Sequence, residues 1–384
     1  MRLMYNLLAK TLHGLEDVLA AELADMGAVD IEKGRRSVSF KGDQKMIYRA
    51  NYSLRSAMSV LKALDSFSIA KAKDLYRKST DYPWETIMGI GQTFMVVPVV
   101  NSSLFNHTAF PALLLKDAIA DRFRKIMRRR PSVDSKNPDI VINCHISEKQ
   151  VNISLDSSVI PLFKRGYRHS HTEASLSEVL AAGIIMISGW DMKSPLLDPM
   201  CGSATLGIEA ALMAGNIPPG KYRKHFGFMS WPDFDNELFK KIRREEEAKT
   251  RPIKTPVYCR DISPANIRIA RANIRKAGLE SEIRTEVADF LASGAEEQSG
   301  FTIIMNPPYG ERLENPDIEN LYSGIGERLK HVYHGSTAWL LSSNFDALKR
   351  IGLRPAAKYT LYNGKLEVKL LKYELYPGSM KGKK

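Results

Sequence analysis

Residues 195–214, PLLDPMCGSATLGIEAALMA, set the fold of the second half of this chain. Residues 195–197 predict a short buried strand, and residues 205–214 predict a helix built from small and apolar side chains. Between them lies a short loop, residues 198–203, whose small residues let backbone N–H groups approach a ligand at a helix N-terminus. The loop matches neither GxGxxG nor GxxxxGK[ST], which argues against pyrophosphate and ATP sites.

The same strand and helix alternation continues on both sides of this loop. Strands are predicted at 256–259, 283–287, 301–305 and 338–341, and helices at 179–187, 264–277 and 318–332. Ser175 and Glu178 form a predicted capping box for the first helix, and Ser263, Pro264 and Gly278 bracket the second. This rhythm indicates an α/β fold with a parallel sheet covered by helices on both faces.

The chain closes its sheet with a predicted antiparallel hairpin. Residues 358–362 and 365–373 flank Asn363-Gly364, a pair that favours a two-residue type I′ turn. Parallel strands ending in such a hairpin resemble the Rossmann-like sheet of S-adenosylmethionine-dependent methyltransferases. A dinucleotide dehydrogenase would instead be expected to continue with parallel strands.

The first half of the chain has a different pattern. Up to about residue 161, short β-rich runs at 37–40, 93–100, 140–146 and 151–155 mix with a helical run at 110–127. This half therefore predicts an α+β region that precedes the α/β unit.

Two acidic residues follow the next strands of the predicted sheet. Asp261 ends the second strand, where a carboxylate commonly accepts hydrogen bonds from ribose hydroxyls, although it also fits the start of a helix. Asp289 follows the third strand, where it could accept from an adenine amine while Phe290 packs on the base. Because ligands of such sheets lie over the carboxyl ends of the strands, these residues predict one cofactor site.

Asn306-Pro-Pro-Tyr-Gly310 comes directly after the apolar strand 301–305. Two prolines remove backbone donors and fix φ, so the loop presents the Asn306 amide oxygen and carbonyl groups as acceptors. The exocyclic amine of a nucleobase is a weak nucleophile, because its lone pair is delocalised into the ring. If Asn306 and the Pro307 carbonyl accept its hydrogens, the lone pair turns toward a methyl donor, and Tyr309 can stack on the base.

The motifs together resemble the THUMP-containing bacterial 23S rRNA guanine-N2-methyltransferases. NPPYGERL, DPMCGSATLGIEAA and LFKRGYRHSHTEASLSEVLAAGI carry the resemblance in the second half, and LHGLEDVLAAELADMGA carries it at the N-terminus. It implies a ferredoxin-like part at 1–43, a THUMP RNA-binding domain at 44–160 and a methyltransferase domain at 161–384. It also implies S-adenosylmethionine as the cofactor, bound by Asp198, Pro199, Cys201, Gly202, Ser203, Thr205, Asp261, Ile262, Asp289 and Phe290. Asn306, Pro307, Pro308 and Tyr309 would form the catalytic corner.

The resemblance leaves two alternatives open. A tRNA guanine-N2-methyltransferase shares the same motifs, because NPPY specifies an amine and not which one. A ribosome-assembly RNA-binding factor with a weakened cofactor site is the alternative from another class. Ala204 motivates it, since the family loop usually reads CGSGT and the extra methyl group could reduce cofactor affinity.

The charge of the chain favours an RNA partner. There are 56 Lys and Arg against 43 Asp and Glu, a net charge of +13. Two basic clusters suit a phosphate backbone, with 23S rRNA or a large-subunit assembly precursor as the expected partner. The residues predicted to bind RNA are Arg122, Lys125, Arg128, Arg129, Arg130, Arg165, Tyr167 and Arg168.

Several function classes are not expected. The three cysteines, Cys144, Cys201 and Cys259, include no CxxC pair, and His169 and His171 have no third ligand nearby, so we expect no metal site. The longest apolar stretch, residues 179–190, is too short to cross a bilayer. We therefore expect a cytoplasmic protein without a membrane partner, and the sequence leaves its oligomeric state open.

Overall fold

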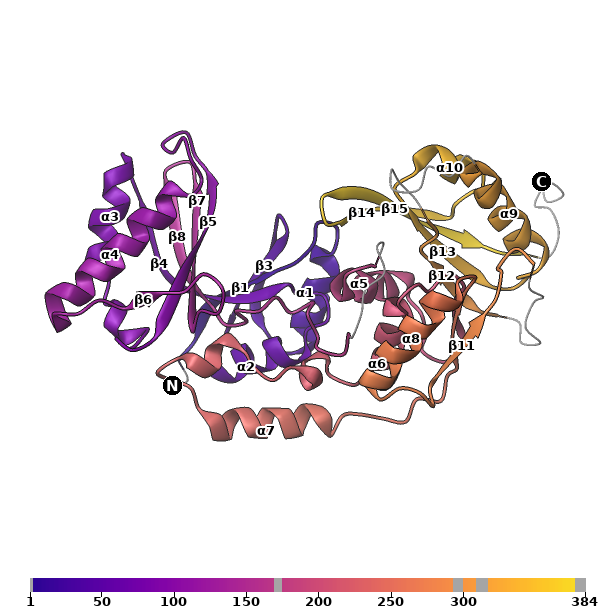
Figure 1. Cartoon of the computed structure of the whole chain (residues 1–384), viewed down its shortest axis with the longest axis horizontal. Coiled ribbons are helices and arrows are strands. Elements are labelled where there is room, and N and C mark those ends of the chain that lie inside the picture. The colour runs from indigo at the N-terminus through magenta and orange to yellow at the C-terminus, as the bar shows by residue number, and fades with distance from the viewer. Residues whose placement is uncertain (1–2, 169–174, 293–299, 309–316, 377–384) are drawn as a thin grey trace. The chain divides into compact units, whose positions relative to one another are not determined.

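The computed structural model describes residues 3–168, 175–292, 300–308 and 317–376, which form two compact units (Figure 1). The first unit holds the chain up to Thr11, Leu19–Leu162 and Arg223–Glu246. The second unit holds Leu12–Val18, Phe163–Tyr222 and the described residues from Glu247 onward.

The first unit is built on an eight-stranded sheet of order β2-β3-β1-β4-β8-β7-β5-β6. Neighbouring strands are antiparallel except that β5 runs parallel to both β7 and β6. The strands are β1 (Tyr5–Lys10), β2 (Val29–Gly34), β3 (Ser37–Gly42), β4 (Ser59–Ser68), β5 (Thr93–Asn101), β6 (Ser132–Val133), β7 (Ile140–Ser147) and β8 (Gln150–Asp156). The α-helices are α1 (Glu16–Asp25), α2 (Gln44–Ser53), α3 (Ala72–Asp81), α4 (Phe110–Met127) and α7 (Asn236–Glu247), with 3-10 turns at Trp84–Thr86 and Gly227–Ser230.

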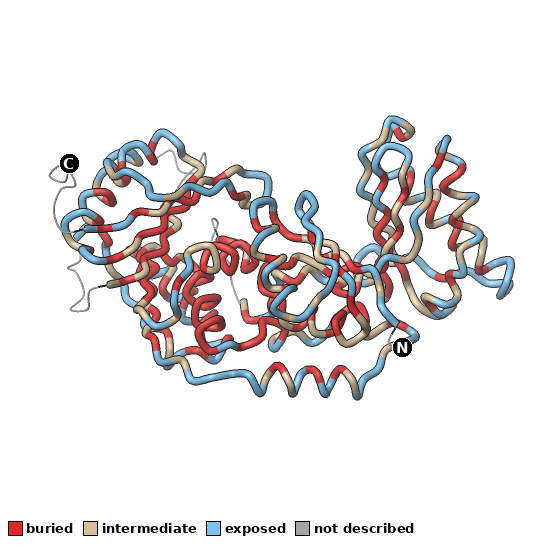
Figure 2. Tube along the Cα trace, turned by 180° about the vertical axis from the view of Figure 1, so that it is seen from behind, coloured by how far each residue is buried: buried red, intermediate tan, exposed pale blue. Residues whose placement is uncertain are grey.

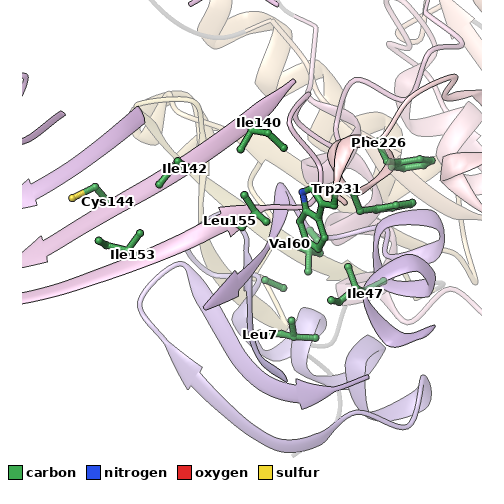
Figure 3. Close-up of a cluster of buried hydrophobic side chains, with 14 of the residues drawn as sticks. Leu7, Ile47, Val60, Ile140, Ile142, Cys144, Ile153, Leu155, Phe226 and Trp231 are labelled. Atoms are coloured by element: carbon green, nitrogen blue, oxygen red, sulfur yellow. The ribbon is translucent and has the colours of Figure 1, made fainter. Parts of the chain in front are cut away.

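The core of the first unit includes a segment from late in the sequence. In β7, the alternating residues from Ile140 to Ile146 pack on one face of the sheet, as the period of a strand requires. Arg223–Glu246 adds aromatic side chains to the same core, and Figure 3 shows Phe226 and Trp231 beside Val60 and Ile47. The expected domain 161–384 includes this segment, which instead packs in the first unit.

The second unit is a seven-stranded sheet of order β11-β10-β9-β12-β13-β15-β14. Its first five strands are parallel, and β15 lies antiparallel between β13 and β14. The strands are β9 (Leu196–Asp198), β10 (Val257–Asp261), β11 (Ile283–Val287), β12 (Thr302–Met305), β13 (Thr337–Ser342), β14 (Ala357–Asn363) and β15 (Leu366–Glu374). The helices are α5 (Glu178–Ser188), α6 (Thr205–Ala214), α8 (Pro264–Ala277), α9 (Ile318–His331) and α10 (Phe345–Lys349), with a 3-10 turn at Pro219–Tyr222. The predicted parallel sheet with a terminal hairpin is confirmed.

Burial explains why the central strands read as continuous apolar runs. Every residue of β9 is buried, as are all but the first residues of β12 and β13, and Figure 2 shows this part of the chain as buried. A parallel sheet covered on both faces has this property. No helix among the described residues has both the length and the apolar character that a membrane crossing requires.

Two predicted positions, a hairpin turn and a helix cap, are shifted by one or two residues in the structure. The hairpin loop is Gly364-Lys365, because Asn363 still pairs with Leu366, and Gly364 adopts the positive φ of +67°. Helix α5 is capped by Ser177, whose side chain accepts from the Leu180 N–H, and not by Ser175. Both Ser175 and Ser177 stand near the helix start, so cap preference alone could not decide between them.

Candidate active site

A cavity of about 640 Å³ lies over the carboxyl ends of four neighbouring strands of the second unit. The loops after β9, β10, β11 and β12 all contribute to its lining. All ten residues expected to bind the cofactor line it, together with Asn306, Pro307 and Pro308. Tyr309, the remaining residue of the expected catalytic corner, lies outside the described residues.

The loop after β9 is held close to the end of β10. The Cys201 N–H donates to the Arg260 carbonyl at 2.8 Å, and the Gly202 N–H donates to Asp261 Oδ2 at 2.9 Å. Helix α6 then packs directly on β10, because a Cβ at Gly207 would lie 2.2 Å from Cys259 Sγ. Glycine at position 207 is therefore required for this loop to sit where it does.

Ala204 occupies a strained backbone position rather than the cavity wall. Its φ of +62° lies in the left-handed region, where a residue with a Cβ costs about 1 kcal/mol. Ala204 is fully buried and is not among the residues lining the cavity. The additional methyl group thus strains the loop but takes no space from a ligand. Ala204 therefore no longer supports the alternative of a weakened cofactor site.

Asp261 and Asp289 occupy contrasting environments. Asp261 is buried, and its Oδ1 accepts from the Ser263 N–H at 2.9 Å and from Asn266 Nδ2 at 3.1 Å. Asp289 is exposed and accepts from the Leu291 N–H at 2.9 Å. Both carboxylates line the cavity, so both present acceptor oxygens to a ligand with hydroxyl or amine donors.

Asp198 is the most deeply buried acid of the site. The pKa of its carboxyl is raised to about 8, mainly by burial; the hydrogen bond from the Met200 N–H opposes this rise and the nearby Asp261 adds to it. A carboxyl with this pKa carries a proton at neutral pH. A cationic group placed in the cavity would favour its ionised form.

The corner after β12 presents an acceptor without a partner. Asn306 Oδ1 is buried and receives no hydrogen bond from the described residues. Pro307 and Pro308 follow it, and the Tyr322 hydroxyl lies 3.4 Å from the Pro308 carbonyl. A buried polar atom left unpaired costs free energy, so this acceptor is suited to a ligand group that carries a donor.

The cavity also has lining residues that the sequence did not indicate. These residues are Ser175, Leu176, Met200, Leu206, Ser263, Asn266, Ile269, Ala288 and Leu321. Asn266 and Ile269 lie on the first turns of α8, directly after the predicted acid Asp261, so the helix start could have indicated them. Leu321 lies on α9 and has no signal in the sequence beyond helical periodicity.

The second basic cluster is not an RNA surface. Arg165 and Tyr167 are each only 1% exposed, and both bond to the buried Glu209, at 3.5 Å and 2.9 Å respectively. The Arg168 side chain, 9% exposed, pairs with Glu178 at 3.2 Å. The prediction that these three residues contact phosphate is wrong, because their polar groups are directed at partners inside the second unit.

The first basic cluster lies at the end of α4 in the first unit. Lys125, Arg128, Arg129 and Arg130 are exposed. Arg122 is instead half-buried, and its guanidinium donates to both carboxylate oxygens of Glu85, at 3.1 and 2.6 Å. The four exposed residues therefore present charge to solvent, whereas Arg122 holds α4 to the Trp84–Thr86 turn.

Comparison with known families agrees with this geometry. Residues 165–372 match the RMKL-like methyltransferase domain, residues 70–156 match the THUMP domain, and residues 6–61 match the RlmL ferredoxin-like domain. The chain belongs to the RMKL-like methyltransferase family. The predicted family and the prediction of a methyltransferase are confirmed, whereas the bounds predicted for its domains stay a prediction.

Three relatives with RNA-methyltransferase names are similar to this chain over nearly its whole length. "Putative RNA methyltransferase slr0064" of Synechocystis sp. is 36% identical, with 96% of each chain covered. "Ribosomal RNA large subunit methyltransferase K/L" of Syntrophotalea carbinolica is 38% identical over 94% of this chain, and that of Methylococcus capsulatus is 40% identical over 95%. The chain spans about half the length of these two K/L relatives, 52% and 50%.

A solved structure shares the fold of this methyltransferase. The crystal structure of "SMU.472, a putative methyltransferase complexed with SAH" has a TM-score of 0.88 and 29% identity, and the match covers 99% of this chain and all of that one. Among the described residues of the present chain, no three His, Cys, Asp or Glu side chains come together as metal ligands would.

Proposed function

We propose that this chain transfers a methyl group from S-adenosylmethionine to the exocyclic N2 amine of a guanine in 23S rRNA. The observation that carries the proposal is that Asn306 lines the cavity and that its buried Oδ1 has no hydrogen-bond partner among the described residues. An acceptor in this position needs a donor, and an aromatic amine offers two. A ribosomal substrate places the reaction in the cytoplasm.

The cavity fits S-adenosylmethionine in size and chemistry. Its volume of about 640 Å³ lies in the range of sites for ligands of this size. Asp261 would hold the ribose hydroxyls, Asp289 the adenine amine, and Ile262 and Phe290 the faces of the purine ring. The loop after β9 would hold the amino-acid end. SAH, the demethylated product, is bound by the structural relative named above.

The residues after β12 would orient the amine rather than deprotonate it. When bound, the cofactor supplies a methyl group on a positively charged sulfur. Asn306 Oδ1 and the Pro307 carbonyl would accept hydrogen bonds from the two N–H groups of the guanine amine, which would make the nitrogen pyramidal and localise its lone pair toward the methyl group. Their rigid placement supplies near-attack geometry, which is worth several powers of ten in rate. A strong base is not required, because the methylated amine loses its proton readily.

The names of the relatives and the charge of the chain support an RNA substrate. The K/L relatives are named as ribosomal RNA large subunit methyltransferases, and the chain carries a THUMP domain and a net charge of +13. Purified protein with labelled S-adenosylmethionine should label guanine N2 in separated 23S rRNA and not in tRNA. Label in tRNA alone would support the tRNA enzyme, and no label in either RNA would favour an assembly factor.

The exposed end of α4 is proposed to contact the RNA backbone. Replacing Arg128, Arg129 and Arg130 together by alanine should weaken RNA binding and reduce the steepness of its salt dependence. Each lost phosphate contact should lower the slope of log K against log salt by about 0.7 to 0.9. The matched control replaces Lys240, Lys241 and Arg244, three exposed cations of α7. Equal losses in the two triple variants would contradict a specific role for α4.

Asp198 should make cofactor binding depend on pH. Its carboxyl, with a pKa of about 8, is protonated at pH 7, and a bound cation favours the ionised form. Binding below pH 8 must then release a proton, so affinity for S-adenosylmethionine should rise up to about tenfold per pH unit toward pH 8 and level off above it. The pKa of the Cys201 thiol is raised well above its ordinary value, by the neighbouring Cys259 and by burial, so this thiol stays neutral.

Calorimetry in buffers of different ionisation enthalpy measures this released proton directly. Asp198→Asn cannot ionise and should bind the cofactor with an affinity that does not change between pH 7 and pH 9. A pH dependence that persists in this variant would assign the titrating group elsewhere.

A further inference from the structure

The cavity described above contains three acids but no basic side chain. Asp198, Asp261 and Asp289 line it, and no Lys, Arg or His is among its described lining residues. The proposed cofactor, on which this inference rests, carries a carboxylate on its amino-acid end. Among the described residues of the cavity wall, the donors available to that carboxylate are neutral.

Hydroxyl groups of the loop after β9 are suitable donors. Ser203 Oγ and Thr205 Oγ1 lie 3.2 Å apart, and both residues line the cavity. Asn273 Nδ2 of α8 donates a hydrogen bond to the Ser203 carbonyl at 3.0 Å, which holds this part of the loop against α8. Thr205 is also the first residue of α6, where backbone N–H groups and the helix dipole favour an anion.

An arginine that is not among the cavity-lining residues contacts one of these hydroxyls, that of Thr205. Arg168 Nη2 lies 2.9 Å from Thr205 Oγ1 and 2.8 Å from the Leu176 carbonyl, and Lys276 Nζ donates to the Arg168 carbonyl at 3.1 Å. A guanidinium has donors only, so Thr205 Oγ1 must act as the acceptor in this contact. The Thr205 proton is thereby directed away from Arg168, toward Ser203 or a ligand in the cavity.

We propose that Arg168 is a positioning residue, which sets the Thr205 hydroxyl as a donor and supplies, from behind it, the positive charge that the cofactor carboxylate requires. Arg168 is not itself among the residues that line the cavity, and it acts through the lining residue Thr205. Its own partner Glu178 offsets part of its charge. Burial raises the pKa of the Glu178 carboxyl to about 7, so at neutral pH this offset is incomplete.

Two ligands that differ only at the amino-acid end test this role. SAH carries the carboxylate, whereas 5′-methylthioadenosine keeps the adenosine and sulfur but lacks it. Arg168→Ala should weaken SAH binding by about 10- to 30-fold, as expected for a lost charge-assisted contact, and should leave binding of 5′-methylthioadenosine within about twofold. Both affinities are measured by calorimetry on the full chain, without any RNA or turnover.

Variants of Thr205 keep the test valid if Arg168→Ala does not fold. Thr205→Val removes the hydroxyl with little change of shape and should show the same loss for SAH alone, while Thr205→Ser should bind like the wild type. Arg168→Ala should cost less in the Thr205→Val background than in the wild type, because the part of its effect that acts through this hydroxyl is already lost. Arg271→Ala, an exposed arginine of α8, is the matched control and should alter neither ligand.

The outcomes separate this inference from the proposed function. Equal losses for both ligands in Arg168→Ala would mean a general disturbance of the site and would overturn the positioning role, as would unchanged SAH affinity. A wild-type chain that binds neither ligand would refute the proposed cofactor itself, and the role of Arg168 with it.

Discussion

Replacing Asn306 by alanine is expected to lower the turnover number by about 1,000-fold while SAH affinity changes by less than about twofold. The side chain removed is the one whose buried Oδ1 has no partner among the described residues, and it follows the last residue of β12. Without this acceptor, the guanine amine stays planar and its lone pair stays delocalised into the ring. The loss therefore falls on the chemical step, which single-turnover kinetics with labelled cofactor measures.

Two further variants show whether the missing acceptor is the cause. Asn306→Asp retains an acceptor oxygen and should recover part of the activity that alanine loses. Asn320→Ala removes an exposed asparagine of α9 that donates to the nearby Asp317 carboxylate, and it should behave like the wild type. A normal turnover number in Asn306→Ala would contradict the amine-orienting role assigned to this residue.

The parts of the site that were predictable from sequence are those with local signals. Residues at the carboxyl ends of the strands of a parallel sheet lie at one edge of it, so the sequence alone places Asp198, Asp261, Asp289 and Asn306 together. The strands themselves were recognised because those buried on both faces read as short apolar runs, and the structure moves their ends by only one or two residues.

The parts that were not predictable depend on partners distant in sequence. Arg165 and Tyr167 carry the same charge and aromatic character as an RNA surface, and only Glu209, more than 40 residues away, shows that they are interior groups. Arg128 and Arg129 belong to a basic cluster of the same kind, but their side chains are exposed. Composition alone cannot separate a solvated cation from one paired inside a unit, because burial is a property of the fold.

The packing of the segment Arg223–Glu246 in the first unit was not predictable for a related reason. Its aromatic residues predict burial but not against which sheet, and the ring of Phe228 packs 4.4 Å from that of Tyr48, early in the chain. Hydrogen bonds add to this: Arg49 Nε donates to Glu246 at 2.7 Å, and the Asp235 N–H donates to the Tyr48 hydroxyl at 3.0 Å. Each unit is built from separate segments of the sequence, so dividing the chain into consecutive domains cannot describe them.

Replacing Asp261 by alanine is expected to weaken SAH binding by about 100-fold, equivalent to about 2.8 kcal/mol. The loss has two sources. The variant has no carboxylate to accept hydrogen bonds from the ribose hydroxyls. It also loses the hydrogen bond that the Gly202 N–H donates to Asp261 Oδ2 at 2.9 Å. Charge-assisted hydrogen bonds of this kind are each worth about 1.5 to 3 kcal/mol, so the loss of these contacts accounts for the expected size.

The matched variants separate these contributions. Asp261→Asn should be nearly as weak as alanine, because both oxygens of Asp261 now accept backbone N–H groups and an amide would direct a donor at one of them. Asp289→Ala removes an exposed acid that bonds to a single backbone N–H, so it should cost about tenfold or less. Calorimetry with SAH measures each affinity, and thermal unfolding without ligand checks that the variants fold. If Asp261→Ala bound SAH as the wild type does, the cofactor would have to lie elsewhere than over the ends of β9 and β10.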